Sequence, residues 1–106
     1  MLIFKYMKTK SLNLLVENAH SASEGLKALS HPTRLLAVCF IGSEEKTVGE
    51  MEAFLGTSQS NISQHLAKLR DKDILVTRKE GNQVFYRLKD KNVLNLISSL
   101  QALYCT

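Results

Sequence analysis

The residues from Ser58 onward combine hydrogen-bonding side chains with a helical apolar spacing. Ile62, Leu66 and Leu69 recur at intervals of four and three, which packs one side of a helix. The open side is then neutral, small and polar, and it carries Gln59, Ser60, Ser63, Gln64 and Ala67. Such groups suit base edges in a DNA major groove, where glutamine pairs with adenine through two hydrogen bonds. We therefore predict DNA contact here; an ordinary solvated helix face is the alternative.

Basic residues and one histidine add candidate contacts to the DNA backbone. Arg78, Lys79 and Arg87 lie in an alternating segment after this helix, so we expect phosphate or minor-groove contact, with a solvated hairpin edge as the alternative. His65 falls toward the packed edge of the helix, which favours a structural or phosphate-contacting role over base reading. His20 and His31 are expected to be surface or capping residues rather than ligands.

The chain has two cysteines, neither in a CxxC zinc pattern nor in a disulfide framework. Cys39 lies in an apolar helix, where a cysteine is usually a small buried hydrophobe. Cys105 is the penultimate residue and is expected to lie near solvent. These residues alone leave open whether the two thiols form a redox pair or are structural.

Five helices and one hairpin must position these groups. We predict a first helix over residues 11–29 and a second that starts at Pro32 and ends near Gly42. Thr47 and Glu50 form a capping box that opens the third helix, and Gly56 ends it in a left-handed conformation. The fourth helix follows from Ser58. Strands over residues 75–79 and 84–88, joined at 80–82, form a wing. This is a mainly α winged helix-turn-helix, and residues 1–106 form a single domain.

The last helix, expected from about Asp90, is apolar over too much of its circumference for one contact. The first helix is similarly apolar. We therefore predict a homodimer built from the two terminal helices, with an interface at Leu15, Ala19, Ile97, Leu100 and Tyr104.

Composition narrows the class of protein. A net charge of +4 over 106 residues favours polyanionic partners. No apolar run is long enough to span a bilayer, and the start, MLIFKYMKTK, lacks a small-residue cleavage site, so we expect a cytoplasmic protein without a signal peptide. We find no activated nucleophile, carboxylate pair or phosphate loop, and we predict neither an enzyme nor a cofactor.

Three segments resemble the ArsR/SmtB family of bacterial winged-helix repressors: SHPTRL, SQSNISQHL and VFYRL. The resemblance covers nearly the whole chain. It is strongest to the metal-independent thiol sensors (BigR/SqrR/YgaV-type and HlyU-like), because of Cys39 and the terminal Leu103-Tyr104-Cys105. The metal sites of the family lack ligands here: Thr47 and Gly49 replace a Cys-x-Cys, and the last histidine is His65, ahead of the final helix.

The resemblance implies a repressor of a small operon that binds an imperfect inverted repeat as a dimer. It also implies that oxidation of Cys39 and Cys105, or their linkage through sulfane sulfur, releases the DNA. A different class of function remains as the alternative. In that interpretation the same fold is a sensorless antirepressor, an architectural module or a protein–protein adaptor, and its cysteines are structural.

Overall fold

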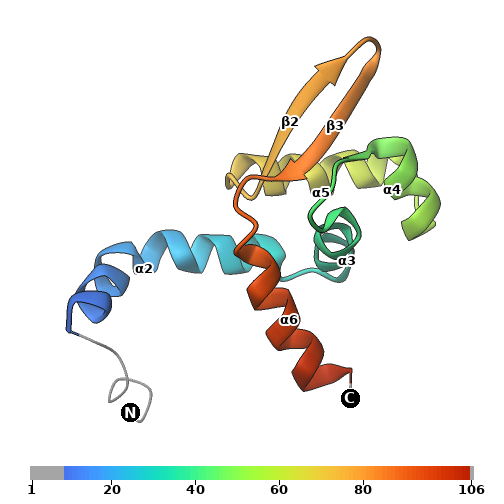
Figure 1. Ribbon diagram of the computed structural model, residues 1–106. Helices are drawn as coiled ribbons and strands as arrows, with labels where there is room; N and C mark the ends of the chain where they lie inside the picture. The colour runs from blue at the N-terminus through green and yellow to red at the C-terminus, as the bar shows by residue number, and fades with distance from the viewer. Residues whose placement is uncertain (1–8, 106) are drawn as a thin grey trace.

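The structure is a computed structural model that describes residues 9–105 (Figure 1). The expectation about a signal peptide was made on residues 1–10, of which residues 1–8 lie outside this range. The described elements follow the predicted order, with one additional short strand. They are α2 (Thr9–Leu29), α3 (Pro32–Ile41), β1 (Lys46–Thr47), α4 (Val48–Leu55), α5 (Gln59–Asp71), β2 (Leu75–Glu80), β3 (Gln83–Leu88) and α6 (Val93–Tyr104).

Local signals set most helix ends where the sequence predicted them. Pro32 opens α3, and the ring nitrogen Nδ1 of His31 accepts a hydrogen bond from the Thr33 backbone N–H at 3.1 Å, so the capping role of His31 is confirmed. Thr47 and Glu50 form the predicted capping box. Gly56 ends α4 at a φ of 67°, a left-handed conformation that glycine adopts without steric cost. The last helix begins at Val93, later than predicted.

The wing is a three-stranded antiparallel sheet in the order β1-β3-β2. The sequence did not predict β1, whose Lys46 and Thr47 pair with Tyr86 and Phe85. Pairing of Glu80 with Gln83 also makes the hairpin strands longer and its tip tighter than expected. A two-residue turn, Gly81-Asn82, joins them, with Gly81 at a φ of 63°. The hairpin projects beyond α5 in Figure 1.

The hydrophobic core lies beneath α5, the predicted recognition helix. Ile62, Leu66 and Leu69 of α5 are fully buried, as their spacing predicted. They pack with Val38 and Ile41 of α3 and with side chains from every other helix and from the wing: Ala28, Leu29, Ala37, Met51, Ile74, Leu75, Leu88 and Ile97. The helix-turn-helix is therefore held by contacts within one chain.

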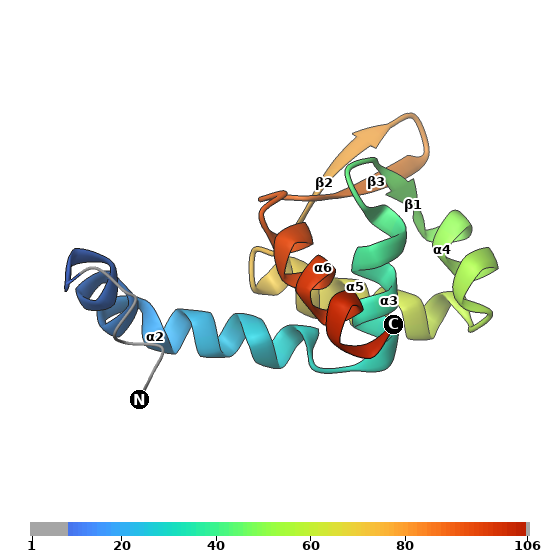
Figure 2. The same ribbon diagram turned by 60° about the horizontal axis from the view of Figure 1, so that its bottom comes forward.

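The terminal helices bury little of their apolar surface within this chain. Both views show α2 extending away from the rest of the molecule, and its only buried residues are Ala28 and Leu29 at its end (Figures 1 and 2). Large apolar side chains are exposed along α2 and α6: Leu14, Leu15, Val16, Leu26, Leu96, Leu103 and Tyr104. Among the helices in residues 9–105, none has the length and apolar character to cross a membrane.

Candidate nucleic-acid interface

The polar side of α5 predicted from the spacing of its apolar residues is exposed. Gln59, Ser60, Ser63 and Gln64 are all exposed, whereas the apolar residues on the other side of the helix are buried. Ser58 caps the start of the helix, and its hydroxyl accepts from the Asn61 backbone N–H at 3.2 Å. A neutral, hydrogen-bonding surface on a rigidly packed helix is the arrangement that major-groove readout requires.

Thr57 and Asn61, which the sequence did not indicate as functional, fix the start of this helix. The Asn61 side-chain amide donates to the Thr57 hydroxyl at 3.0 Å, across the turn between α4 and α5. This bond joins the turn to the first helical turn of α5, where Gln59 and Ser60 project. Both residue types are common in turns and caps, so the local signal existed, but it did not specify the partner.

The wing tip lies beside the start of the recognition helix. Gln59 lines a hollow of about 290 Å³ together with Asn82 and Gln83 of the tip and Thr47 to Gly49 at the start of α4. Only Gln59 was predicted as a site residue. The side chains of Asn82 and Gln83 come close to it through tertiary packing, which sequence spacing does not reveal. The start of α5 and the wing tip therefore border one hollow, with polar side chains from both elements at its wall.

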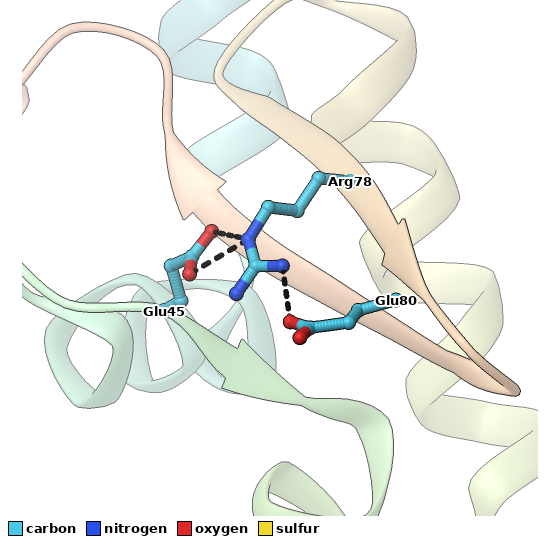
Figure 3. A network of polar contacts seen from close by, with 3 residues as sticks. All are labelled: Glu45, Arg78 and Glu80. Atoms are coloured by element: carbon cyan, nitrogen blue, oxygen red, sulfur yellow. Dashed lines mark hydrogen bonds and ion pairs between the residues drawn. The ribbon is translucent and has the colours of Figure 1, made fainter.

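Arg78 differs from the other wing cations because carboxylates hold it (Figure 3). Its Nε donates to both carboxylate oxygens of Glu45, at 2.8 and 2.9 Å, and a terminal nitrogen donates to Glu80 at 2.7 Å. The guanidinium also stacks 4.4 Å from the centre of the Phe85 ring. Hydrogen bonding to Arg78 lowers the pKa of the Glu45 carboxyl, so Glu45 is ionised at neutral pH. Any contact of Arg78 with phosphate competes with these two carboxylates.

The three basic wing residues do not share one face. Arg78 lies opposite Phe85 and Arg87 opposite Val76, which places both arginines on one side of the hairpin. Lys79 lies opposite Val84 and projects from the other side. Among the ion pairs formed by residues 9–105, none involves Lys79 or Arg87, and both side chains are exposed. These two cations are more available to phosphate than Arg78.

His65 is half-buried and packs against the start of α3, as its predicted position at the helix edge suggested. Its ring centre lies 4.3 Å from that of His31. Its Nδ1 is buried without a hydrogen-bond partner among the residues that the structure describes. Burial lowers the pKa of His65, and the nearby His31, Arg34 and Lys68 lower it further, so the ring is neutral at neutral pH. His65 therefore connects α5 to α3 rather than facing the groove.

The two cysteines line the same pocket, although 65 residues separate them in the chain. The pocket lies between α3 and α6, and its volume is about 260 Å³. Both cysteines are free and exposed, so the expectation of a buried Cys39 was wrong. Partial burial nevertheless raises the pKa of the Cys39 thiol, and the neighbouring Cys105 raises it further. The exposure of Cys39 and the raised pKa of its thiol are compatible, because α3 and α6 cover one side of the thiol while the other side faces solvent.

The described residues around this pocket do not form a metal centre. Within residues 9–105, no group of three or more histidine, cysteine, aspartate or glutamate side chains is arranged to hold an ion.

The predicted dimer contacts differ in exposure. Ile97 is only 6% exposed and belongs to the core of its own chain. Leu15, Ala19 and Tyr104 are exposed, whereas Leu100 is half-buried against the core.

Comparison with known proteins identifies the family of this fold. The profile of bacterial regulatory proteins of the arsR family matches residues 31–76, from the cap of α3 into β2. The chain is 40% identical over 102 residues to the transcriptional activator HlyU of Vibrio cholerae, which covers 94% of each chain. The chain belongs to the ArsR family. It is a DNA-binding transcriptional regulator, and the members of this ArsR family are not enzymes.

Other ArsR proteins match over similar lengths. The regulator YgaV of Escherichia coli is 37% identical over 92 residues, which is 86% of this chain and 93% of YgaV. The crystal structure of the transcriptional repressor BigR from Xylella fastidiosa superposes with a TM-score of 0.81 at 35% identity, and the match covers 94% of this chain and 99% of BigR. The predicted likeness to BigR, YgaV and HlyU within the ArsR family is thus confirmed, as is the winged helix-turn-helix fold.

Proposed function

We propose that this ArsR protein is a cytoplasmic homodimeric repressor that binds an imperfect inverted repeat and leaves it when Cys39 and Cys105 become linked. The observation that carries the proposal is that both thiols line one pocket between α3 and α6. The related BigR is named a repressor, which supports repression as the direction of regulation. DNA is read by the exposed polar face of α5, with backbone contacts from the wing.

The dimer is supported by the apolar residues that the single chain leaves exposed. Leu15 and Val16 on α2 are 44% and 68% exposed, and Leu103 and Tyr104 on α6 are 72% and 81% exposed. Exposed apolar side chains on two terminal helices that the chain itself does not cover are typical of an interface between subunits. A dimer would place two copies of α5 so that each reads one half-site, with a spacing of about one DNA turn.

The proposed switch is a covalent link between α3 and α6. An oxidant that accepts two electrons converts the two thiols into a disulfide with release of two protons. Alternatively, a sulfane-sulfur donor forms a persulfide on one cysteine. Attack by the other thiolate on the inner sulfur of that persulfide leaves a disulfide and releases hydrosulfide. If the donor modifies both cysteines, attack by one persulfide on the inner sulfur of the other leaves a sulfur-bridged crosslink and again releases hydrosulfide. Either bond ties α3, which packs under the recognition helix, to α6 of the proposed interface. We infer that the link changes the separation of the two recognition helices.

The test compares reduced and oxidised protein in an operator-binding titration. We expect the reduced protein to bind and the treated protein to release DNA, with a Cys39–Cys105 peptide from one chain in mass spectrometry. Reducing agent should restore binding. Cys39→Ser and Cys105→Ser should each bind DNA with or without oxidant. A double variant that still releases DNA on oxidation would overturn the switch and leave the cysteines structural.

The alternative is a sensorless DNA-binding antirepressor or architectural module, or a protein–protein adaptor. The related HlyU, which is named an activator, supports an antirepressor, since such a protein activates by displacing a repressor. Footprinting of the operator with and without a resident repressor separates displacement from direct repression. If the protein is an adaptor, its affinity for DNA should not depend on the salt concentration. If it contacts phosphates, its affinity for DNA should fall steeply as the salt concentration rises.

A further inference from the structure

The pocket between α3 and α6 is lined by apolar or uncharged side chains among the residues that the structure describes. Its walls come from Leu35, Leu36 and Cys39 of α3 and from the end of α6: Ile97, Leu100, Gln101, Tyr104 and Cys105. None of these side chains carries a charge at neutral pH when the thiols are protonated. Gln101 is the only amide among them.

The walls select among the reagents that reach the sulfur atoms. A neutral apolar molecule gains from leaving water for an apolar surface, whereas a carboxylate or sulfonate must lose part of its hydration without a cation in the wall to replace it. The net charge of +4 acts in the opposite direction, because the long-range field of the protein attracts anions. A preference of these thiols for neutral reagents would therefore come from the pocket itself.

We propose that this pocket is a covalent binding site for small, neutral, apolar electrophiles of the α,β-unsaturated carbonyl class, which add to Cys39. The Cys39 thiolate attacks the β-carbon, a carbon–sulfur bond forms, and the α-carbon takes a proton from water. This is an addition: no group leaves, and no oxidant or reductant is required. The volume of about 260 Å³ is sufficient for one small ring between Leu36 and Leu100.

The consequence for regulation rests on the proposed function, in which the relation of α3 to α6 controls affinity for DNA. An adduct on Cys39 occupies the space that separates the two helices and blocks the link to Cys105. The protein would then respond to two chemical signals at one site, one that joins α3 to α6 and one that inserts between them.

The experiment uses two reagents that share one reactive ring and differ in charge: N-ethylmaleimide and N-(carboxyethyl)maleimide. Rates at Cys39 are measured by peptide mass spectrometry on the full chain and expressed as the ratio of neutral to anionic reagent. Using the ratio removes the effect of the raised pKa of Cys39, which slows both reagents alike. We expect the ratio to exceed that of free cysteine by roughly tenfold, the cost of partly dehydrating a carboxylate. Equal ratios would overturn the site.

A matched pair of variants localises the effect. Gln101→Glu places a carboxylate on the pocket wall with almost no change in shape, and we expect it to slow the anionic reagent by a further ~3–10-fold through repulsion at short range. Asn13→Asp makes the same change from amide to carboxylate on the exposed α2 and should leave both rates unchanged. If Asn13→Asp acts as strongly as Gln101→Glu, the selectivity comes from net charge, and the proposal fails.

The outcomes for the pocket and for the switch can be told apart. Operator release is measured after N-ethylmaleimide and, separately, after the thiol oxidant diamide. Release by diamide without charge selectivity for maleimides refutes the electrophile site and leaves the disulfide switch intact. Charge selectivity at Cys39 with release by N-ethylmaleimide but not by diamide supports the site and refutes the disulfide switch.

Discussion

The reading half of the molecule (α3, α4 and α5) and its terminal helices (α2 and α6) differ in how much of their apolar surface they bury within one chain. In the reading half, α3, α4 and α5 bury Val38, Met51 and Leu66 completely within one chain. In α2 and α6, by contrast, Val16 and Leu103 remain largely exposed. The first half buries its core within one chain, whereas the second leaves apolar side chains uncovered. In the proposed dimer, the part that reads DNA is therefore packed independently of the part that sets the spacing between the two copies.

The largest expected effect is on stability, and it differs between a substitution in the reading half and one in a terminal helix. Leu66→Ala removes a fully buried side chain beneath the recognition helix and should lower the free energy of unfolding by about 2–5 kcal/mol. Leu103→Ala shortens a side chain that is 72% exposed and should change the stability of the single chain by less than about 0.5 kcal/mol. Urea denaturation at low protein concentration measures both.

The same pair tests the proposed interface. Leu103→Ala should weaken self-association in sedimentation equilibrium, whereas Leu66→Ala should act first on folding. A Leu103→Ala protein that associates as tightly as the parent would contradict an interface at the end of α6. Ile97 is unsuitable for this test because it lies in the core of its own chain.

Local sequence signals predicted the reading half well. The cap at His31, the capping box at Thr47 and the apolar spacing of α5 each act over a few residues, and the structure confirms all three. The sequence did not indicate what depends on tertiary contact. The pairing of β1 with β3, the approach of Glu45 to Arg78 and the hollow beside Gln59 each join segments that are distant in the chain.

The two cysteines show that neither the burial of a side chain nor its pairing with a distant residue follows from local sequence. Sequence alone favoured a buried Cys39, because apolar neighbours along a helix are common for core residues. Exposure depends on which helix packs against that face, and α6 leaves the thiol open on one side. Only the family resemblance suggested the pairing with Cys105, since no periodicity links two residues in separate helices.

The next effect concerns specificity within the reading half. Gln64→Ala should weaken operator binding by about 1–3 kcal/mol if its amide makes a bidentate base contact, and it should change affinity for random duplex much less. Gln101→Ala, on the terminal helix, is the matched control and should alter neither in the reduced protein. Equal losses on operator and random DNA would assign Gln64 to positioning on the backbone.

A smaller effect is expected from releasing Arg78 in the wing. Glu45→Gln removes the carboxylate that accepts from the Arg78 Nε and so frees the guanidinium for phosphate. Affinity for random duplex should rise by about 0.5–1 kcal/mol, and the slope of log K against log salt should steepen by about 0.9 per chain for one new phosphate contact. The exposed Glu17→Gln on α2 makes the same charge change away from the wing and should leave the slope unchanged. A slope that steepens equally in both variants would show a general charge effect.

The smallest expected effect is the pH dependence of stability that His65 adds at the junction of α5 with α3. Burial lowers its pKa in the folded chain below the ordinary value of 6.5, so the unfolded chain binds a proton more readily. The contribution is fully present above the unfolded pKa and is lost as pH falls through the folded pKa. His31, Arg34 and Lys68 are the charged or titratable groups beside it, and all of them disfavour the imidazolium. Urea midpoints from about pH 7.5 down to about pH 5 span the window below the unfolded pKa. His65→Gln should flatten the decline, whereas His20→Gln, exposed on α2, should reproduce the parent curve. A His65→Gln curve parallel to that of the parent would place the titrating group elsewhere.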